Sequence, residues 1–279
     1  MNTSHPNTSR PKTPRTALVT GASSGIGRAC AEALVARGYR VFGTSREPSK
    51  IAPGDVVDGV RYVPLDLRVP SSIEALPALV GDVVVLVNNA GESQCGPLED
   101  LPAETIADLF QLNVFGPLRL TQLFLPGMRA RRFGRVVMVG SMLASFPLAY
   151  RSCYVATKAA LKGFSDAARF ETSPFGVWLT TVEPGSINTG IAERRTTSIA
   201  DGSPYAGDFT TVLAALDQRS HAGIAPRQVA EIVLAAVESE HPKPLYAVGS
   251  RAPMMFALKR LAPRTMVEKL VARGHGLAR

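Results

Sequence analysis

The sequence predicts an α/β fold, in which a single doubly wound parallel sheet is flanked by helices. Short apolar runs that resemble strands alternate with amphipathic runs that resemble helices over most of the 279 residues, without an internal repeat. The run at 83–87 is continuously apolar, as expected of a central strand buried on both faces. Glycine-rich or polar turns follow several strands, at the sheet edge where such folds bind ligands.

Composition favours one soluble domain. Hydrophobic residues make up 46% of the chain, enough for the core of a single α/β domain. No run of about eighteen apolar residues could span a bilayer, and the first residues lack the apolar core of a signal peptide. We therefore expect a cytoplasmic protein. Residues 1–14, rich in Asn, Thr, Ser and Pro, are expected to form a disordered tail.

The net charge of +8 is concentrated at the two ends of the chain. Residues 1–16 contain three Lys or Arg residues, and residues 251–279 contain seven against a single acid, Glu268. The part between them is near neutral, so a basic groove for nucleic acid is not expected.

Three cysteines are present, Cys30, Cys95 and Cys153. Their odd number, without CxxC spacing or a nearby pair of histidines, argues against both a disulfide framework and a metal site. Reduced, packed thiols are expected, although Cys153 lies next to Tyr154 and could be reactive.

The first predicted strand, 16–20, leads directly into Gly21-Ala-Ser-Ser-Gly25-Ile-Gly27 and then into an amphipathic helix that reaches Arg37. A strand, a glycine turn and a helix in this order leave backbone N–H groups facing a pyrophosphate. The glycine spacing differs from G-x-G-x-x-G, which indicates a related turn. A plain βα turn is the alternative. The candidate cofactor-binding residues here are Gly21, Ser23, Ser24, Gly25, Ile26 and Gly27.

The next two predicted strands, 39–44 and 61–65, end in residues that could bind the adenosine half of a dinucleotide. Ser45 and Arg46 follow the first strand. An acid there would bind a free 2′-hydroxyl, whereas an arginine pairs with a 2′-phosphate, so Arg46 favours NADP(H) unless it is a solvated loop charge. Asp66, followed by Leu67, could accept a hydrogen bond from the adenine amine or cap a turn.

The central run 83–87 ends in Asn88-Asn-Ala-Gly91, whose small and amide residues allow close approach of a cofactor. Asn88, Ala90 and Gly91 are the candidates in this turn. A helical pattern follows over 102–125, with Asn113 among apolar positions. A buried amide is costly unless it is paired, so we interpret Asn113 as functional.

A predicted strand at 135–139 and a predicted helix at 152–170 carry the clearest chemistry. Tyr154 and Lys158 are four residues apart on the helix, so a phenol and an ammonium share one face and could act on one bound molecule. A neighbouring cation stabilises a phenolate. Ser141, just after the strand, could add a hydroxyl. On spacing alone, an ordinary solvated helix face is the alternative.

The remaining elements complete a domain that we place at 15–250. A strand at 177–182 leads into Glu183-Pro-Gly-Ser-Ile-Asn-Thr189. Residues 190–224 have weak periodicity and several glycines, and we expect a mobile flap over a pocket. A helix at 226–239 and a short strand at 244–248 follow.

Taken together, these motifs resemble the short-chain dehydrogenase/reductase superfamily over roughly residues 15–250. They occur in order as Thr20-Gly-Ala-Ser-Ser-Gly-Ile-Gly27, Asn88-Asn-Ala-Gly91, Asn113, Ser141, Tyr154-xxx-Lys158 and Pro184-Gly185. Thr44-Ser-Arg46, the segment before Gly185 and the basic C-terminal part resemble the hydroxysteroid and retinol dehydrogenase-like reductases.

The resemblance implies a Rossmann-type fold and NADP(H)-dependent interconversion of a carbonyl and an alcohol. Tyr154 would be the general acid or base, and Lys158 would assist it and hold the nicotinamide ribose. Ser141 would donate to the developing alkoxide, and Asn113 would hold a water for proton relay. Contacts with the cofactor would also come from Pro184, Gly185, Ile187 and Thr189. A homodimer or homotetramer is also expected.

The competing function is a non-catalytic NADP-binding sensor or scaffold on the same fold. The complete set of Asn113, Ser141, Tyr154 and Lys158 argues against it.

The residues around Ser141 predict an apolar pocket and a hydrophobic substrate that is steroid-, retinoid- or lipid-like. The candidate pocket residues are Gln94, Met142, Leu143, Phe146, Leu148, Ile191 and Tyr205. In the C-terminal extension 251–279, Pro263 divides residues 253–272 into two short amphipathic pieces with interspersed basic residues. These pieces could roof the pocket, pack against a second subunit or rest weakly on an anionic membrane surface.

Overall fold

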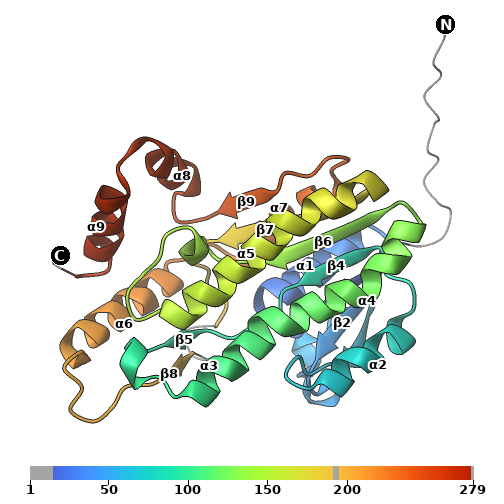
Figure 1. The fold of residues 1–279 in the computed structure, drawn as a ribbon. Coiled ribbons are helices and arrows are strands. Elements are labelled where there is room, and N and C mark those ends of the chain that lie inside the picture. Colours follow the sequence, from blue (N-terminus) through green and yellow to red (C-terminus); the bar gives the residue numbers. More distant parts are fainter. Residues whose placement is uncertain (1–14, 191–194, 278–279) are drawn as a thin grey trace, which may run out of the picture.

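The computed structural model describes residues 15–190 and 195–277, and it contains the predicted parallel sheet (Figure 1). The tail 1–14 lies outside the described residues. The sheet has seven strands in the order β3-β2-β1-β4-β6-β7-β9, with every pair parallel. The strands are β1 (Thr16–Val19), β2 (Arg40–Ser45), β3 (Val60–Pro64), β4 (Val85–Asn88), β6 (Gly134–Val139), β7 (Val177–Pro184) and β9 (Leu245–Val248). The strand order reverses between β1 and β4, which opens a crevice at their carboxyl ends.

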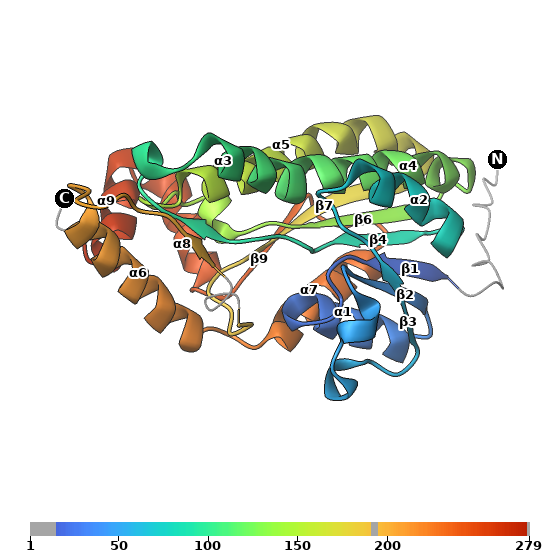
Figure 2. The same ribbon diagram turned by 90° about the horizontal axis from the view of Figure 1, so that it is seen from below.

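Helices cover both faces of the sheet. Figure 2 shows the helices α2, α4 and α5 on one side and α1 and α7 on the other. Their bounds are α1 (Gly25–Ala36), α2 (Pro70–Val80), α4 (Gly116–Ala130), α5 (Ser152–Thr172) and α7 (Pro226–Glu238). The doubly wound architecture is therefore confirmed.

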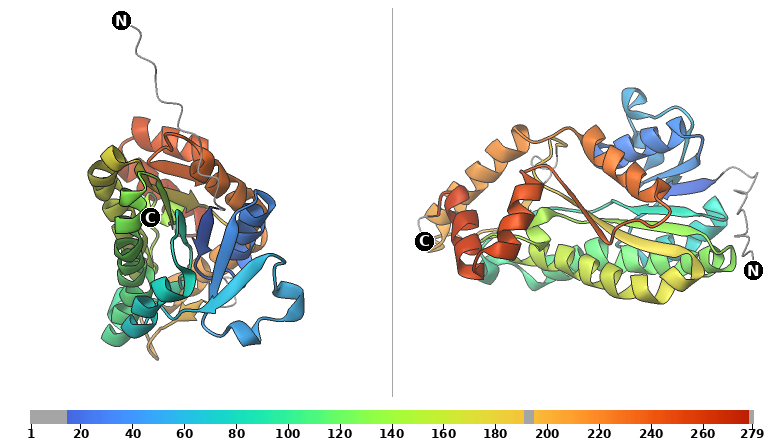
Figure 3. Two further views of the ribbon diagram at one scale, coloured as in Figure 1. Left: turned by 90° about the vertical axis from the view of Figure 1, so that its right-hand side faces the viewer. Right: turned by 90° about the horizontal axis from the view of Figure 1, so that it is seen from above.

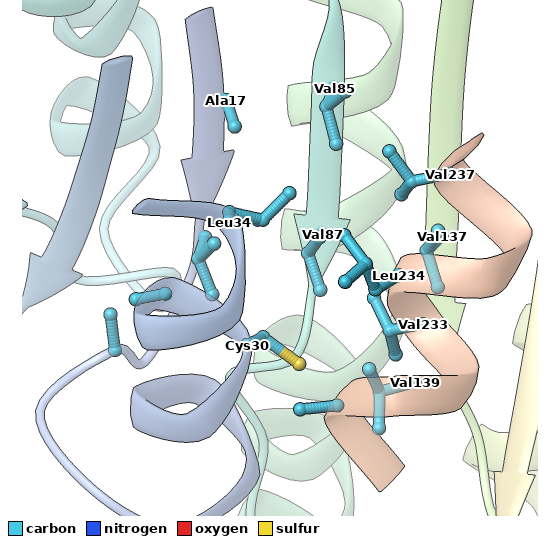
Figure 4. Packing of buried hydrophobic residues seen from close by; sticks show 14 of the residues in the cluster. Ala17, Cys30, Leu34, Val85, Val87, Val137, Val139, Val233, Leu234 and Val237 are labelled. Atoms are coloured by element: carbon cyan, nitrogen blue, oxygen red, sulfur yellow. The ribbon is translucent and has the colours of Figure 1, made fainter. Parts of the chain in front are cut away.

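Alternate residues of each central strand pack under different helices. Ala17 and Val19 of β1 belong to a cluster with α1 and α7, whereas Leu18 between them belongs to a second cluster with α2, α4 and α5. Figure 4 shows the first cluster, in which Leu34 and Cys30 of α1 meet the valines of β4, β6 and α7.

The three cysteines are free and buried, as expected of packed thiols. Burial raises the pKa of the Cys30 thiol to about 12, so this thiol stays protonated at neutral pH. Cys153 packs in a small cluster with Leu101 and Leu109.

The predicted helix at 102–125 is divided into three segments. Helix α3 (Ala103–Phe110) runs into a π-helical turn (Gln111–Phe115), and α4 follows. Asn113 lies inside this turn and is completely buried. Such wide turns are rare and often occur at functional sites, which draws attention to Asn113.

The region 190–224 differs from the irregular flap that the sequence predicts. It contains helix α6 (Ala206–His221), and a short strand β8 (Thr196–Thr197) pairs in parallel with β5 (Gln94–Cys95). Phe209 and Val212 are the buried residues of α6. A face with so few apolar residues gives a weak periodic signal, so packing rather than local pattern stabilises this helix.

The C-terminal extension forms two helices separated at Pro263, as predicted. They are α8 (Ala252–Leu261) and α9 (Arg264–Gly274), and both pack on the protein's own body at the end opposite to the first described strand (Figure 3). Phe256 of α8 meets Phe146 edge to face, with ring centroids 5.1 Å apart. Lys259 Nζ donates to the carbonyl oxygen of Ser145 at 2.6 Å. The extension is thereby attached to the segment that follows Ser141.

None of the described helices is long and apolar enough to cross a membrane. The cytoplasmic location stays a prediction.

Candidate active site

Three of the catalytic candidates line one cavity of about 670 Å³. Ser141 follows the end of β6, and its Oγ accepts a hydrogen bond from the backbone N–H of Leu143 at 3.2 Å. Tyr154 and Lys158 occupy the first two turns of α5. The carboxyl end of a parallel strand and the start of the next helix therefore bring a hydroxyl, a phenol and an ammonium to the same space.

Lys158 is buried, with 6% of its surface exposed. Its Nζ donates to the carbonyl oxygen of Val139 at 3.0 Å and lies 5.8 Å from the centre of the Tyr154 ring. Burial lowers the pKa of the Lys158 ammonium, and the nearby Tyr154 partly offsets this effect. A cation held beside a phenol favours the charged form of the phenol during proton transfer.

Asn113 binds the backbone of the loop after β4. Its Oδ1 accepts from the N–H of Glu92 at 2.9 Å, and its Nδ2 donates to the carbonyl oxygen of Glu92 at 3.0 Å and to Thr157 Oγ1 at 3.3 Å. The Thr157 hydroxyl donates in turn to the backbone carbonyl of Tyr154 at 2.8 Å. The amide therefore fixes this loop against the catalytic helix. A role in holding a water stays a prediction.

A second cavity, of about 420 Å³, continues from the first. The two share lining residues on both sides, including Ile26, Gly91 and Thr189. Predicted cofactor residues that line one or both cavities are Gly21, Ser23, Ser24, Gly25, Ile26, Ser45, Arg46, Asp66, Leu67, Ala90, Gly91, Tyr154, Lys158, Pro184, Gly185, Ile187 and Thr189. Together the cavities form a continuous cleft along the carboxyl edge of the sheet.

The glycine loop fits the pyrophosphate of a dinucleotide. Gly21 and Gly25 have φ angles of +65° and +55°, a conformation that side chains disfavour. A Cβ atom at Gly27 would lie 2.2 Å from the carbonyl oxygen of Gly21, so this position also requires glycine. Helix α1 begins at Gly25, which directs its N-terminal N–H groups toward the cleft.

The adenosine candidates lie at the far end of this cleft. Arg46 follows β2 directly and is exposed on the lining of the second cavity. Asp66 also lines it, and its Oδ1 accepts from the backbone N–H of Arg68 at 2.9 Å. Asp66 therefore caps a turn, which is one of the two roles that the sequence suggests for it.

Two predicted cofactor residues lie outside the cleft. Asn88 is buried on the other side of the strand end, where its Nδ2 donates to Thr121 Oγ1 at 3.1 Å. Successive residues of an extended chain face opposite sides, so the neighbouring Asn89 lines the cleft instead. Asn89 Nδ2 donates to the carbonyl oxygen of Thr20 at 2.9 Å and ties the two loops together. Gly27 lines neither cavity and serves the close packing of the glycine loop.

The predicted substrate residues divide in a similar way. Met142, Leu143 and Phe146 line the first cavity, whereas Gln94, Leu148 and Tyr205 do not. Gln94 is buried in the β5–β8 pair, and Leu148 packs in the cluster that includes α9. The hydroxyl of Tyr205 donates to Glu99 at 3.0 Å on the surface. Ile191 lies outside the described residues.

The sequence reasoning missed several residues of the first cavity. The guanidinium of Arg151 lies 4.2 Å from the centre of the Tyr154 ring, and its Nη1 donates to Ser93 Oγ at 2.9 Å. Its spacing of three residues from Tyr154 at the start of a helix was an available signal. The C-terminal helices form part of the cavity wall, through Met254, Met255, Leu270, Val271, Gly274 and His275. The sequence left three roles open for the extension, and the structure shows the first of them: the extension covers one side of the pocket.

No group of three or more potential metal-ligating side chains occurs in the part of the chain that the structure describes.

The comparisons with known proteins agree with this geometry. The family model described as short chain dehydrogenase matches residues 15–200. A 3-ketodihydrosphingosine reductase of Bacteroides thetaiotaomicron is 31% identical over 250 residues, which are 88% of this chain and 91% of that protein. Retinol dehydrogenase 8 of Homo sapiens is 36% identical over 186 residues, 63% of this chain and 60% of that protein.

Among solved structures, the crystal structure of a short-chain dehydrogenase from Streptomyces avermitilis matches with a TM-score of 0.80 and 34% identity, covering 95% of this chain and 99% of that chain. A match of this extent shows a common fold over nearly the whole chain. The protein thus belongs to the short-chain dehydrogenase/reductase family, in its hydroxysteroid and retinol dehydrogenase-like branch, and is an oxidoreductase of the kind that uses a nicotinamide nucleotide.

Proposed function

We propose that this protein is an NADP(H)-dependent oxidoreductase that interconverts a carbonyl and a primary or secondary alcohol on a hydrophobic small molecule. One observation carries the proposal: Ser141, Tyr154 and Lys158 line a cavity that continues into the cleft of the glycine loop. A substrate in the first part would meet a nicotinamide ring that enters from the second.

The chain's own residues would handle the proton and the charge. When bound, the nicotinamide nucleotide supplies or accepts the hydride. Tyr154 gives its phenolic proton to the substrate oxygen in reduction and takes it back in oxidation. Ser141 donates a hydrogen bond to the same oxygen, a type of stabilisation worth about 2.7–4 kcal/mol in a preorganised site. Lys158, held by the carbonyl of Val139, keeps a positive charge near the phenol.

The apolar substrate class is supported by the wall of the cavity. Met142, Leu143 and Phe146 come from the segment after Ser141, and Met255 and Val271 come from the C-terminal helices. Two relatives act, by name, on 3-ketodihydrosphingosine and on retinol, which are both largely apolar molecules.

Preference for NADP(H) is supported by the end of β2. Arg46 is the first charged residue after this strand and lines the cleft, and Glu47 is paired with Lys50 at 2.5 Å. An arginine can pair with a 2′-phosphate, whereas the acid that follows it, Glu47, does not line the cleft.

Replacing Arg46 by Asp tests this preference. We expect the ratio of kcat/KM for NADPH to that for NADH to fall at least tenfold, because the loss of one hydrogen bond to a charged group has an effect of about this size. Arg227→Asp is the control, because Arg227 lies on α7 outside both cavities. An unchanged ratio in Arg46→Asp would show that another residue reads the phosphate.

The experiment that separates catalysis from a sensor role uses Tyr154→Phe. The wild type should consume NADPH with members of a panel of apolar ketones and aldehydes, and the variant should lose this turnover while NADPH binding, followed by its fluorescence, is kept. Wild-type turnover in the variant would refute the proposed proton transfer. A wild type that binds NADPH but reduces no member of the panel would favour the sensor.

We also propose a homodimer or homotetramer. Four phenylalanines at and near α4 and α5 are 40% exposed or more, an apolar group that a second subunit could cover. They are Phe115, Phe164, Phe170 and Phe175. Light scattering of the purified protein would decide this, and a monomer at micromolar concentration would contradict it. Weak membrane association through α8 and α9 stays a prediction for liposome co-sedimentation.

A further inference from the structure

The cavity that contains Ser141 and Tyr154 has an unbalanced charge. Among the residues that the structure describes, five Lys or Arg residues line it against one acid, Glu92. The cations are Arg151, Lys158, Arg195, Arg219 and Arg251. Glu92 is already engaged, because its carboxylate pairs with Arg68 and accepts from the hydroxyl of Thr196. The net positive charge of the lining is therefore not neutralised from within the cavity.

Two of these cations belong to the reacting end. Lys158 is held by Val139 beside the phenol, and Arg151 lies over the Tyr154 ring with its Nη1 on Ser93. Arg251 stands at the exposed start of α8. Arg195 and Arg219 remain. Arg219 belongs to α6, and Arg195, in the segment before β8, is paired with Asp217 of the same helix.

Arg195 is the more buried of the two. Its side chain is only 4% exposed, and its Nη1 lies 2.7 Å from Asp217 Oδ1 of α6. Its Nε is buried without a hydrogen-bond partner. A buried donor left unpaired destabilises the folded protein, and an acceptor inside the cavity would relieve this cost.

Arg219 follows Asp217 by two residues on the same helix. Its Nη2 donates to the carbonyl oxygen of Gly274 at the end of α9, and no carboxylate pairs with it among the described residues. Burial and the charge of Arg219 both lower the pKa of His275, which also lines the cavity. Asp217 offsets the charge of Arg195, so among the described residues Arg219 supplies the positive charge of this part of the wall, and Arg195 Nε is a spare N–H donor.

Apolar side chains also line this part of the wall, alongside Ser220 and His275. Leu216 of α6 and Leu270 and Val271 of α9 line the same cavity. A ligand that reaches from Tyr154 to Arg219 would therefore pass apolar side chains and end at guanidinium groups, whose planar donors match carboxylate and phosphate oxygens.

We propose that this cavity selects a substrate whose apolar body carries the reacting carbonyl or alcohol and ends in an anionic group, a carboxylate or a phosphate, bound by Arg195 and Arg219. This inference rests on the proposed function, because it assigns the substrate class of the same site. It adds an oxyanion subsite to a pocket that the sequence predicts to be largely apolar.

The test compares three ketones that share one alkyl chain: a long-chain oxo acid, its methyl ester and the corresponding oxoalkyl phosphate. The wild type should have a kcat/KM for at least one anion about tenfold or more above that for the ester, mostly through KM. Arg219→Gln should lower kcat/KM for that anion about 10- to 100-fold and leave the ester unchanged. The better of the two anions identifies the headgroup.

Arg273→Gln is the matched control, since Arg273 is exposed on α9 and does not line the cavity. A second variant, Arg195→Gln with Asp217→Asn, removes the buried guanidinium together with its carboxylate, so no unpaired charge is left. It should show the same selective loss. Anions no better than the ester, or a loss in Arg219→Gln that is equal for the ester, would overturn the subsite.

Failure of the proposed function gives a different result. If none of the three ketones is reduced, the proposed reaction is wrong. The anionic subsite is then tested separately, by measuring how tightly the three ketones bind. With NADP⁺ present, calorimetry should show the oxo acid or the phosphate binding more tightly than the ester, with this advantage lost in Arg219→Gln. Equal binding of all three would overturn the anionic subsite as well.

Discussion

Replacing Asn113 by Ala should lower both the stability and the turnover of the protein. The substitution removes the two hydrogen bonds to the Glu92 backbone and the bond to Thr157. An unpaired backbone group costs about 1–3 kcal/mol when buried. Glu92 is only partly buried, so the low end of this range, about 1–1.5 kcal/mol, applies to its N–H and to its C=O, and we expect a loss of about 2–3 kcal/mol in the free energy of unfolding. For a chain of this size that corresponds to a fall of roughly 4–12 °C in Tm.

Turnover should fall for the same physical reason. The loop 91–93 and the start of α5 line the cavity together, and Asn113 joins them through Glu92 and Thr157. Thermal melting by circular dichroism measures the first effect, and kcat with a reducible ketone measures the second. Asn88→Ala is the matched control, because Asn88 is an equally buried amide that bonds to Thr121 and lines neither cavity. It should lower Tm without a comparable loss of kcat.

Either of two results would refute this reasoning. An unchanged Tm with abolished turnover in Asn113→Ala would mean that the amide acts in the chemistry rather than through the loop. A lower Tm with wild-type kcat would mean that the loop needs no such anchor for catalysis.

Two further predictions concern Glu183, at the end of β7, and the C-terminal helices α8 and α9. Burial raises the pKa of Glu183, and the nearby Ser145 hydroxyl and Lys162, whose Nζ lies 3.7 Å from Glu183 Oε1, offset this effect only in part. The folded state therefore binds this proton more tightly than the unfolded state, and stability should decline as the pH rises from about 4.5 through the raised pKa. Glu183→Gln should remove that decline and raise Tm at pH 8; a lower Tm at pH 8 would contradict it. Truncation after Ser250 should impair activity toward bulky apolar carbonyls more than toward small ones while NADPH affinity is kept, since α8 and α9 supply one wall of the cavity. Equal losses of activity for small and bulky substrates, in a truncated protein that is still folded, would show that α8 and α9 do not select substrates by size.

Much of the fold could be predicted because its strands are locally distinctive. The apolar run at 83–87 anticipates β4 to within two residues at its start, and it lies at the centre of the sheet as its composition indicates. Pro263 separates α8 from α9 because proline cannot continue the preceding helix. These features depend on short stretches of chain, which sequence patterns report well.

Features that depend on distant contacts could not be predicted in the same way. Helix α6 has few buried apolar residues, and Val212 packs with Val267 and Val271, more than fifty positions away in the chain. The exchange of Asn88 for Asn89 at the cleft has a similar origin. Both amides occur in the same turn, and the residue at which β4 ends decides which of them faces the cofactor side.

The charge of the active-site cavity shows why the net charge summed along the chain does not predict the charge of a binding site. Between the two basic ends the charges nearly cancel, which argues against a long basic groove but says nothing about where the remaining cations meet. Arg151 comes from the start of α5, Arg195 from the segment before β8, and Arg219 from α6. Among the described residues, only one acid, Glu92, lines the cavity with them, and Asp217, which pairs with Arg195, does not line it. A neutral body can therefore enclose a cationic pocket, because folding sorts charges by position in space, and a substrate responds to the local field rather than to the net charge.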